Sequence, residues 1–217
     1  MQHRKIVLVG SGGHAAELVD YIESANEKSS PIQFEILGLL DDAKTNYDRY
    51  SFAYPYLGTI KEHEVLEDVD YLMGIANMKY RKPIIVDLKS KGAKFASFIH
   101  PTAIISRTAE WGEGCVISHN VSLGPKVKLG DFNLINSRCT IGHDTQIGSY
   151  NFLSPQVVTG GMSRLGNENF LGTNAAILPM VKVGNCNVIS AGMIVEKNVE
   201  DDATVFHRFK EKIIAVK

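Results

Sequence analysis

The chain has 217 residues, of which 44% are hydrophobic and 22% are charged, and its formal net charge is −1. This composition predicts one or two globular domains with a substantial core and argues against disorder. Because 23 basic residues nearly cancel 24 acidic ones, no global field favours nucleic acid or an anionic membrane as a partner.

The apolar runs and the cysteines indicate where the protein works. No run approaches the roughly 18 apolar residues of a membrane-spanning helix, and the run at residues 6–9 lacks the length and cleavage site of a signal peptide. Three scattered cysteines without a CxxC motif suit a reducing compartment. We therefore expect a cytoplasmic protein without a membrane span.

Residues 1–98 alternate between strand and helix patterns. Apolar runs at 6–9, 34–40, 71–76 and 95–99 predict strands. Leu18, Val19 and Ile22 share one helical face, residues 79–89 are amphipathic, and residues 61–67 predict a short polar helix. This alternation predicts a small, three-layer, Rossmann-like α/β domain with a parallel sheet.

The second half, residues 99–217, has a different period. An Ile, Leu or Val recurs every six residues from Ile99 to Val195, with Trp111 and Thr159 as the two exceptions. Two ladders with a spacing of 18 residues overlie it, one of Gly and one of Asn: Gly112, Gly130, Gly148, Gly166 and Gly184, and Asn133, Asn151, Asn169 and Asn187. Three hexads therefore form one triangular coil of a solenoid. We expect Gly and Asn at corners that need a positive φ. The alternative, a β-sandwich of short strands, would show turn signals at irregular spacing, whereas the spacing here is regular.

The N-terminal half contains a candidate phosphate site. The segment GSGGHA at residues 10–15 follows a predicted strand and opens a predicted helix, where backbone N–H groups and the helix dipole favour an anion. Asp41 and Asp42 end the second strand, and the loop 74–77, which contains Ala76, follows the third. Strand ends of this kind bind ligands in open α/β sheets, although a solvated turn also explains the two aspartates. The segment fits a dinucleotide signature only weakly, because an NAD site would need a second βαβ half.

The hexads resemble the left-handed parallel β-helix of the hexapeptide-repeat acyltransferases. Together with GSGGH at residues 10–14, they are similar to the bacterial nucleotide-sugar acetyltransferases that act on 4-amino sugars and to the related sialic acid O-acetyltransferases. The resemblance implies a metal-free, acetyl-CoA-dependent N-acetyltransferase acting on a UDP-4-amino-4,6-dideoxy sugar in polysaccharide biosynthesis. It also implies a homotrimer with active sites at subunit interfaces. O-acetylation of a sialic acid or another hydroxyl acceptor is the alternative.

By this resemblance, His143 is the candidate general base. It stands third in the hexad IGHDTQ, near a predicted corner, and Asp144 follows it. A neutral imidazole can take a proton from the ammonium group of an amino sugar, and a carboxylate can fix its tautomer. Because adjacent side chains on a strand point to opposite faces, the pair requires a bend. A solvated corner histidine is the alternative interpretation.

The resemblance also implies binding residues. Gly12, Gly13 and His14 would contact the nucleotide sugar, Asp41 and Asp42 the uridine, and Asn136 the sugar. Acetyl-CoA would run past Gly161, Thr173 and Ala191, and Phe152 occupies the place of a second histidine that some relatives carry near the thioester. The pair Gly160-Gly161 offers backbone N–H groups for an oxyanion, or is a plain turn. In the C-terminal tail, Arg208, Lys210 and Lys212 could attract the CoA phosphates.

Two other classes of protein remain to be weighed. A zinc carbonic anhydrase on the same solenoid needs three histidine ligands, but His119 and His143 are 24 residues apart, which is not a multiple of 18. A scaffold or sugar-binding module would leave His143 and Asp144 without a role.

Overall fold

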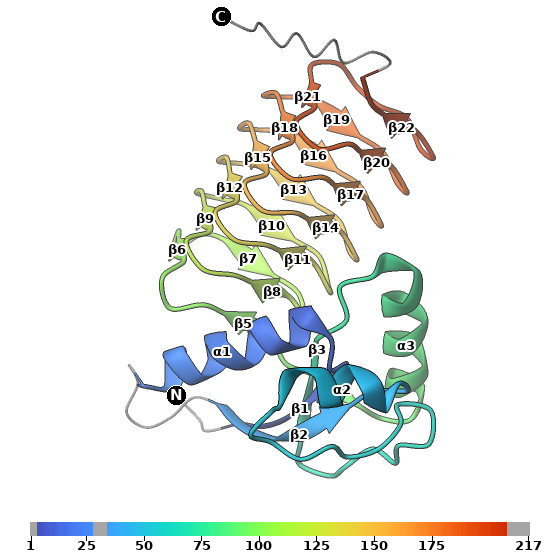
Figure 1. Ribbon diagram of the computed structural model, residues 1–217. Helices are drawn as coiled ribbons and strands as arrows, with labels where there is room; N and C mark the ends of the chain where they lie inside the picture. Colours follow the sequence, from blue (N-terminus) through green and yellow to red (C-terminus); the bar gives the residue numbers. More distant parts are fainter. Residues whose placement is uncertain (1–3, 28–33, 208–217) are drawn as a thin grey trace, which may run out of the picture.

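In the computed structural model, residues 4–27 and 34–207 are described. An α/β domain lies at one end of a solenoid of short strands (Figure 1). Its elements are β1 (Arg4–Val9), α1 (Gly13–Glu27), β2 (Phe34–Leu40), α2 (Lys44–Tyr50), β3 (Asp70–Met73), α3 (Met78–Ser90) and β4 (Lys94–Phe95). The sheet is parallel, in the order β2-β1-β3-β4. The predicted α/β domain is therefore confirmed.

The two faces of this sheet are covered by different helices. Alternate residues of β1 point to opposite sides, as in any strand. Ile6 and Leu8 pack in one cluster with the buried face of α1, whereas Val7 and Val9 pack with Ile85 and Leu88 of α3 and with β3 and β4. Residues 6–9 are completely buried, which explains why the run is apolar at every position. The domain thus has the expected three layers.

Two predicted elements differ in the structure. Residues 61–67 form no helix, because side chains occupy their backbone N–H groups: Asp42 accepts from Lys61, Thr59 from Glu62, and the Tyr71 hydroxyl from Leu66. The run 95–99 belongs to two sheets, since β4 ends the α/β sheet and β5 (Phe98–Ile99) starts the solenoid. Helix α2 was not predicted because it buries no residue and therefore has no apolar stripe.

Up to residue 207, the solenoid consists of eighteen two-residue strands in three parallel sheets. The first sheet contains β5, β8 (Val116–Ile117), β11 (Leu134–Ile135), β14 (Phe152–Leu153), β17 (Phe170–Leu171), β20 (Val188–Ile189) and β22 (Thr204–Val205). The second contains β6 (Ile104–Ile105), β9 (Ser122–Leu123), β12 (Thr140–Ile141), β15 (Val158–Thr159), β18 (Ala176–Ile177) and β21 (Ile194–Val195). The third contains β7 (Glu110–Trp111), β10 (Lys128–Leu129), β13 (Gln146–Ile147), β16 (Arg164–Leu165) and β19 (Lys182–Val183).

The hexad prediction is confirmed. Each residue of the aliphatic series is the second residue of a strand from β5 to β21, and successive coils pair with an offset of 18, as in Leu134 with Phe152. The inward side chains form one continuous core. The last coil is shorter, because Val188 of β20 pairs with Thr204 of β22 at an offset of 16, so the register does break in the C-terminal segment. The residues after 207, with Arg208, Lys210 and Lys212, lie outside the described part of the chain.

The three sheets meet at three corners. We call the corner from the first to the second sheet the first corner (residues 136–139 in the central coil), the next the second corner (142–145), and the one leading back to the first sheet the third corner (148–151). The fourth residue of nearly every hexad has a positive φ, between 54° and 70° from Gly114 to Gly192.

The prediction that the Gly and Asn ladders supply these positive φ values is wrong. The left-handed residue lies two positions after the ladder glycine and is usually not Gly, as with Phe132 and Tyr150. A ladder glycine is needed for a different reason: a Cβ at Gly148 would lie 2.7 Å from the carbonyl oxygen of Gly166 in the next coil. The asparagines face inward instead, where the side chain of Asn151 accepts a hydrogen bond from the backbone N–H of Asn169.

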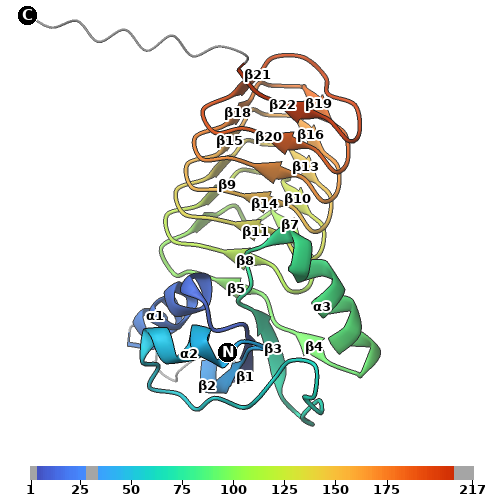
Figure 2. The ribbon, with the colours of Figure 1, turned by 45° about the vertical axis from the view of Figure 1, so that its right-hand side comes forward.

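The α/β domain packs on the first sheet and reaches two corners. The cluster around α1 includes Phe98, Val116 and Leu134, the outward residues of the first three strands of that sheet. On the other side, α3 lies along the third corner (Figure 2), where Lys82 pairs with Glu168 and the rings of Phe132 and Tyr150 stack. None of the helices in the described part of the chain is long and apolar enough to cross a membrane.

Candidate active site

A cavity of about 480 Å³ opens at the carboxyl edge of the α/β sheet. It lies between the ends of β1, β2 and β3 and the beginnings of α1 and α3. Six residues predicted to bind substrate line it: Gly12, Gly13, His14, Asp41, Asp42 and Ala76. The structure therefore brings them together, while their role in binding stays a prediction. Asn46 of α2 and Tyr80 of α3, which were not identified from the sequence, also line the cavity. Asn46 could not be found because the sequence of α2 lacks the apolar stripe that would have predicted a helix there.

The two aspartates of this cavity differ in what they can offer a ligand. Asp41 is 8% exposed, and its carboxylate accepts hydrogen bonds from Ser11 N–H and Oγ, from Ala43 N–H and from Asn46. Asp41 thus ties the loop between β1 and α1 to the loop between β2 and α2 and to α2 itself. Asp42 is exposed and accepts one hydrogen bond, from the N–H of Lys61. Of the two, Asp42 is the carboxylate with free acceptor capacity.

His14 lies at the first turn of α1 and is largely buried. Its Nδ1 is 3.5 Å from Oε2 of Glu17, and the hydrogen bond from His14 lowers the pKa of Glu17 despite partial burial. The Nε2 atom of His14 is buried and has no hydrogen-bond partner within residues 4–27 and 34–207. Because buried polar atoms are nearly always paired, a ligand in the cavity that forms a hydrogen bond with this atom would bind more tightly.

The imidazole of His143 is held at the second corner of the third coil. Its Nδ1 lies 2.9 Å from Oδ2 of Asp144, although the two residues are adjacent. The bend that this pairing requires is present, because Asp144 has a φ of 58°. The His143 side chain is 56% exposed, so the imidazole lies at the surface of the solenoid.

The next coil is shaped around the His143 ring. A Cβ at Gly161 would lie 2.6 Å from Nε2 and 2.8 Å from Cε1 of His143, so only glycine leaves room for the imidazole there. The two glycines of the pair also differ in their hydrogen bonds. The N–H of Gly160 donates to the carbonyl of Ile177, whereas that of Gly161 makes no hydrogen bond within residues 4–27 and 34–207. Of the pair, Gly161 is the one with a donor for an oxyanion.

The remaining predicted residues are distributed over the solenoid. Asn136 lies at the first corner, where its Oδ1 accepts from the N–H of Ser137. Thr173 and Ala191 are exposed at the same corner of later coils. Phe152 points outward from the first sheet and stacks on Phe170, 5.4 Å between centroids. Within a single chain these residues therefore do not surround His143.

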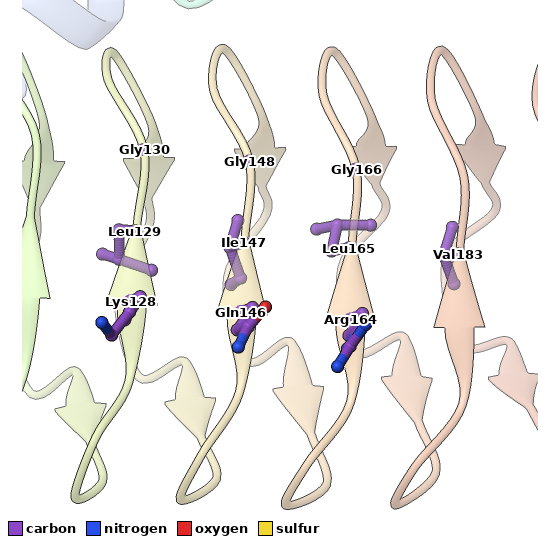
Figure 3. Close-up of a pocket in the computed structure, with 10 residues that line it drawn as sticks. All are labelled: Lys128, Leu129, Gly130, Gln146, Ile147, Gly148, Arg164, Leu165, Gly166 and Val183. Carbon is purple, nitrogen blue, oxygen red and sulfur yellow. The ribbon is translucent and has the colours of Figure 1, made fainter.

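A second hollow is present on the outward face of the third sheet. It has a volume of about 520 Å³ and is open, and the side chains of Lys128, Gln146 and Arg164 stand in a row along it (Figure 3). None of the predicted site residues lines it. No three His, Cys, Asp or Glu side chains are grouped to hold a metal ion among the residues that the structure describes.

Residues 5–88 match the family of PglD N-terminal domains. The UDP-N-acetylbacillosamine N-acetyltransferase of Bacillus subtilis is 26% identical over 116 residues, which are 52% of this chain and 51% of that protein. The match thus spans about half the length of this curated relative.

Solved structures match over nearly the whole chain. The acetyltransferase domain of PglB from Neisseria gonorrhoeae, in complex with acetyl coenzyme A, is 26% identical with a TM-score of 0.79, covering 94% of this chain and 96% of that one. PerB from Caulobacter crescentus, in complex with CoA and GDP-perosamine, is 22% identical with a TM-score of 0.79, covering 92% of both chains. With an N-terminal domain of the PglD type joined to a β-helix, the chain has the architecture of the hexapeptide-repeat nucleotide-sugar acetyltransferases, and the predicted resemblance is confirmed.

Proposed function

We propose that the protein transfers the acetyl group of acetyl-CoA to the amino group of a nucleotide-linked sugar. The arrangement that carries this proposal is the imidazole of His143, oriented by Asp144 and seated over Gly161. The cavity in the α/β domain is of a size suited to a nucleotide. The Bacillus relative is named as an N-acetyltransferase of a UDP-linked sugar, and the Neisseria structure contains acetyl-CoA; both support the same reaction.

The chemistry follows from the needs of acetyl transfer. A sugar ammonium must lose a proton before its nitrogen can attack the thioester carbonyl. Asp144 accepts a hydrogen bond from the Nδ1–H of His143, which leaves Nε2 unprotonated and able to take the proton of the sugar ammonium. The amine nitrogen then attacks the thioester carbonyl and forms the C–N bond of a tetrahedral intermediate. When this intermediate collapses, the C–S bond breaks, the imidazolium gives its proton to the departing thiolate, and the nitrogen loses its second proton to solvent. The free N–H of Gly161 stabilises the oxyanion of the tetrahedral intermediate.

For the substrate we propose a UDP-4-amino-4,6-dideoxy sugar. The N-terminus of α1 at Gly12 and Gly13 would hold the diphosphate. Asp42 would accept hydrogen bonds from the base or the ribose, and His14 Nε2 would find its missing partner in the bound ligand.

We further propose a homotrimer in which His143 of one subunit faces the nucleotide cavity of its neighbour. Two observations support this. The α/β domain packs on the first sheet and the third corner, whereas His143 lies at the second corner. The outward face of the second sheet carries no charged residue, and three of its side chains, Ile104, Val158 and Ile194, are aliphatic and 73%, 42% and 56% exposed. Exposed aliphatic side chains on an uncharged face favour an interface between proteins.

The experiment measures release of free CoA with UDP-linked and GDP-linked 4-amino sugars, and with free sialic acids to test O-acetylation. We expect turnover with a UDP-4-amino sugar. His143→Ala should lower kcat by about 10²–10⁴-fold and leave the binding of both substrates, measured by calorimetry, unchanged. His207→Ala, an exposed histidine at the far end of the solenoid, is the matched control. Near-normal turnover of His143→Ala would refute the role of this residue, and absence of turnover with every amino sugar would refute the reaction.

A further inference from the structure

Arg81 is a buried cation whose charge the protein does not compensate. It lies in the second turn of α3 and is 2% exposed. All three guanidinium nitrogens are buried, and none has a hydrogen-bond partner among the residues that the structure describes. Because a buried, unpaired charge is among the most destabilising features that a fold can contain, a group outside the chain is needed to pair with it.

The groups nearest to Arg81 do not supply a negative charge. Burial raises the pKa of the Cys115 thiol to about 11 and also raises that of the Tyr150 hydroxyl, so both are neutral near pH 7. The pKa of Arg81, lowered by burial to about 10, leaves the guanidinium charged. Glu168 is paired with Lys82, with Nζ and Oε1 2.6 Å apart, and forms no ion pair with Arg81 among the described residues.

A small cavity lies beside this cation. Its lining is Met78, Arg81, Lys82, Tyr150 and Glu168, and its volume is about 20 Å³. A site needs about 10–15 Å³ on this measure to hold one water molecule, so the cavity has room for a single occupant of the size of a water molecule or a halide. Phosphate, sulfate and a carboxylate side chain are too large. The lining carries two cations and one carboxylate, a net charge of +1.

We propose that this cavity binds one monovalent anion of halide size, chloride in physiological buffers, as a structural ligand. Arg81 donates to it from the core side, and Lys82 and the Tyr150 hydroxyl line its other walls. The anion neutralises the net charge of the lining and fixes α3 against the third corner of the solenoid. A neighbouring subunit cannot take its place, since Arg81 is already buried within one chain.

The test follows thermal unfolding of the full chain while chloride replaces gluconate at constant ionic strength. A ligand that binds only the folded state raises the unfolding midpoint with its concentration. We expect a saturable rise of a few degrees for the wild type. Arg81→Met should abolish the chloride dependence. A wild-type midpoint that does not respond to chloride, or an equal response in Arg81→Met, would overturn the proposal.

Two lysines of α3 provide a matched pair in case Arg81→Met does not fold. Lys82 and Lys89 each pair with a glutamate and lie over an aromatic ring, but only Lys82 lines the cavity. Lys82→Met should weaken the response to chloride, and Lys89→Met should keep it; equal responses would count against the site. In crystals soaked in bromide, an anomalous peak beside the Arg81 guanidinium is expected, and a water molecule there instead would refute the anion.

Discussion

The pairing of His143 with Asp144 depends on one backbone angle. Neighbouring side chains of an extended strand point apart, but Asp144 adopts the left-handed conformation and turns its carboxylate back toward Nδ1. Because the fourth position of each hexad takes this conformation in almost every coil, the fold provides the bend irrespective of the side chain. The solenoid thus supplies the geometry, and the sequence supplies the two functional groups.

Gly161→Ala tests whether the ring of His143 must lie where the structure has it. The added Cβ would stand 2.6 Å from Nε2, so the imidazole must move. We expect kcat to fall by at least tenfold, since small displacements of a catalytic group are costly, with little change in the unfolding midpoint. In the His143→Ala background the same substitution should have no further effect on kcat. An additive loss in the double variant would show that Gly161 acts independently of the imidazole.

The three cysteines should differ in reactivity. Cys115 and Cys139 are fully buried, and burial raises their pKa values to about 11 and about 12, whereas Cys186 is exposed. We expect iodoacetamide at pH 8 to label Cys186 alone in the native protein and all three after denaturation. Native labelling of Cys139 would contradict the packed core of the solenoid.

The same two thiols predict a loss of stability at alkaline pH. Their folded pKa values lie above the unfolded value of about 8.5, so the stability that they contribute is complete below that value and is lost as the pH rises toward 11–12. We expect the unfolding midpoint to fall more steeply above pH 9 in the wild type than in a Cys115→Ala/Cys139→Ala variant. Parallel pH profiles of the two proteins would contradict this.

At the scale of the structural element, the coils are joined by two asparagine ladders that differ in exposure. The inner ladder is buried: Asn151 Oδ1 accepts from the backbone N–H of Asn169, and Nδ2 of Asn151 donates to Asn133. The outer ladder is exposed and runs in the opposite direction: Asn167 Oδ1 accepts from the backbone N–H of Ser149 in the preceding coil, and Nδ2 of Asn167 donates to Asn185 in the following coil. Water can replace a lost partner in the outer ladder but not in the inner one.

Asn151→Ala and Asn167→Ala therefore form a matched pair of variants. Asn151→Ala should lower the free energy of unfolding by about 1–3 kcal/mol for each buried group left unpaired, whereas Asn167→Ala should stay within about 0.5 kcal/mol of the wild type. Denaturant titration measures both. Equal costs would mean that the inner ladder contributes no more than its exposed counterpart.

The architecture of these elements was predictable because the hexad spacing follows directly from a coil of three short strands. The reason for the glycines was not, since close approach of stacked backbones at Gly148 depends on contacts 18 residues away. The cavity was predictable from the strand ends at Asp41 and Ala76, but the hydrogen bonds that occupy Asp41 were not. Nor does any local pattern indicate that Arg81 is buried, because charged residues on amphipathic helices usually face solvent.

At the scale of the whole molecule, the proposed trimer separates the two halves of each site between chains. Gly12→Trp should block the proposed nucleotide cavity, which Gly12 lines and where nothing lies within 4 Å of a Cβ at this position. His143→Ala removes the base. Either variant alone should be inactive, yet random mixed trimers should regain about a quarter of wild-type activity. In an equal mixture about half of the sites contain an intact base, and about half of those face an intact cavity on the neighbouring subunit. Measurement on co-expressed, doubly tagged protein tests this; complete inactivity of the mixed trimers would place both halves in one chain.

Because the coils stack regularly, the height of His143 along the solenoid axis is set by the number of coils beneath it. Strand β12, which precedes His143, stands two coils from β6 in the second sheet, a height of about 10 Å at 4.8 Å per coil. Removing or inserting one complete winding below β12 would lower or raise the imidazole by a single step of about 4.8 Å. Because α1 and α3 pack on these coils, an altered winding must keep the side chains that they contact. Acceptors of different length can thus be accommodated by whole-winding deletions or duplications that preserve this packing surface.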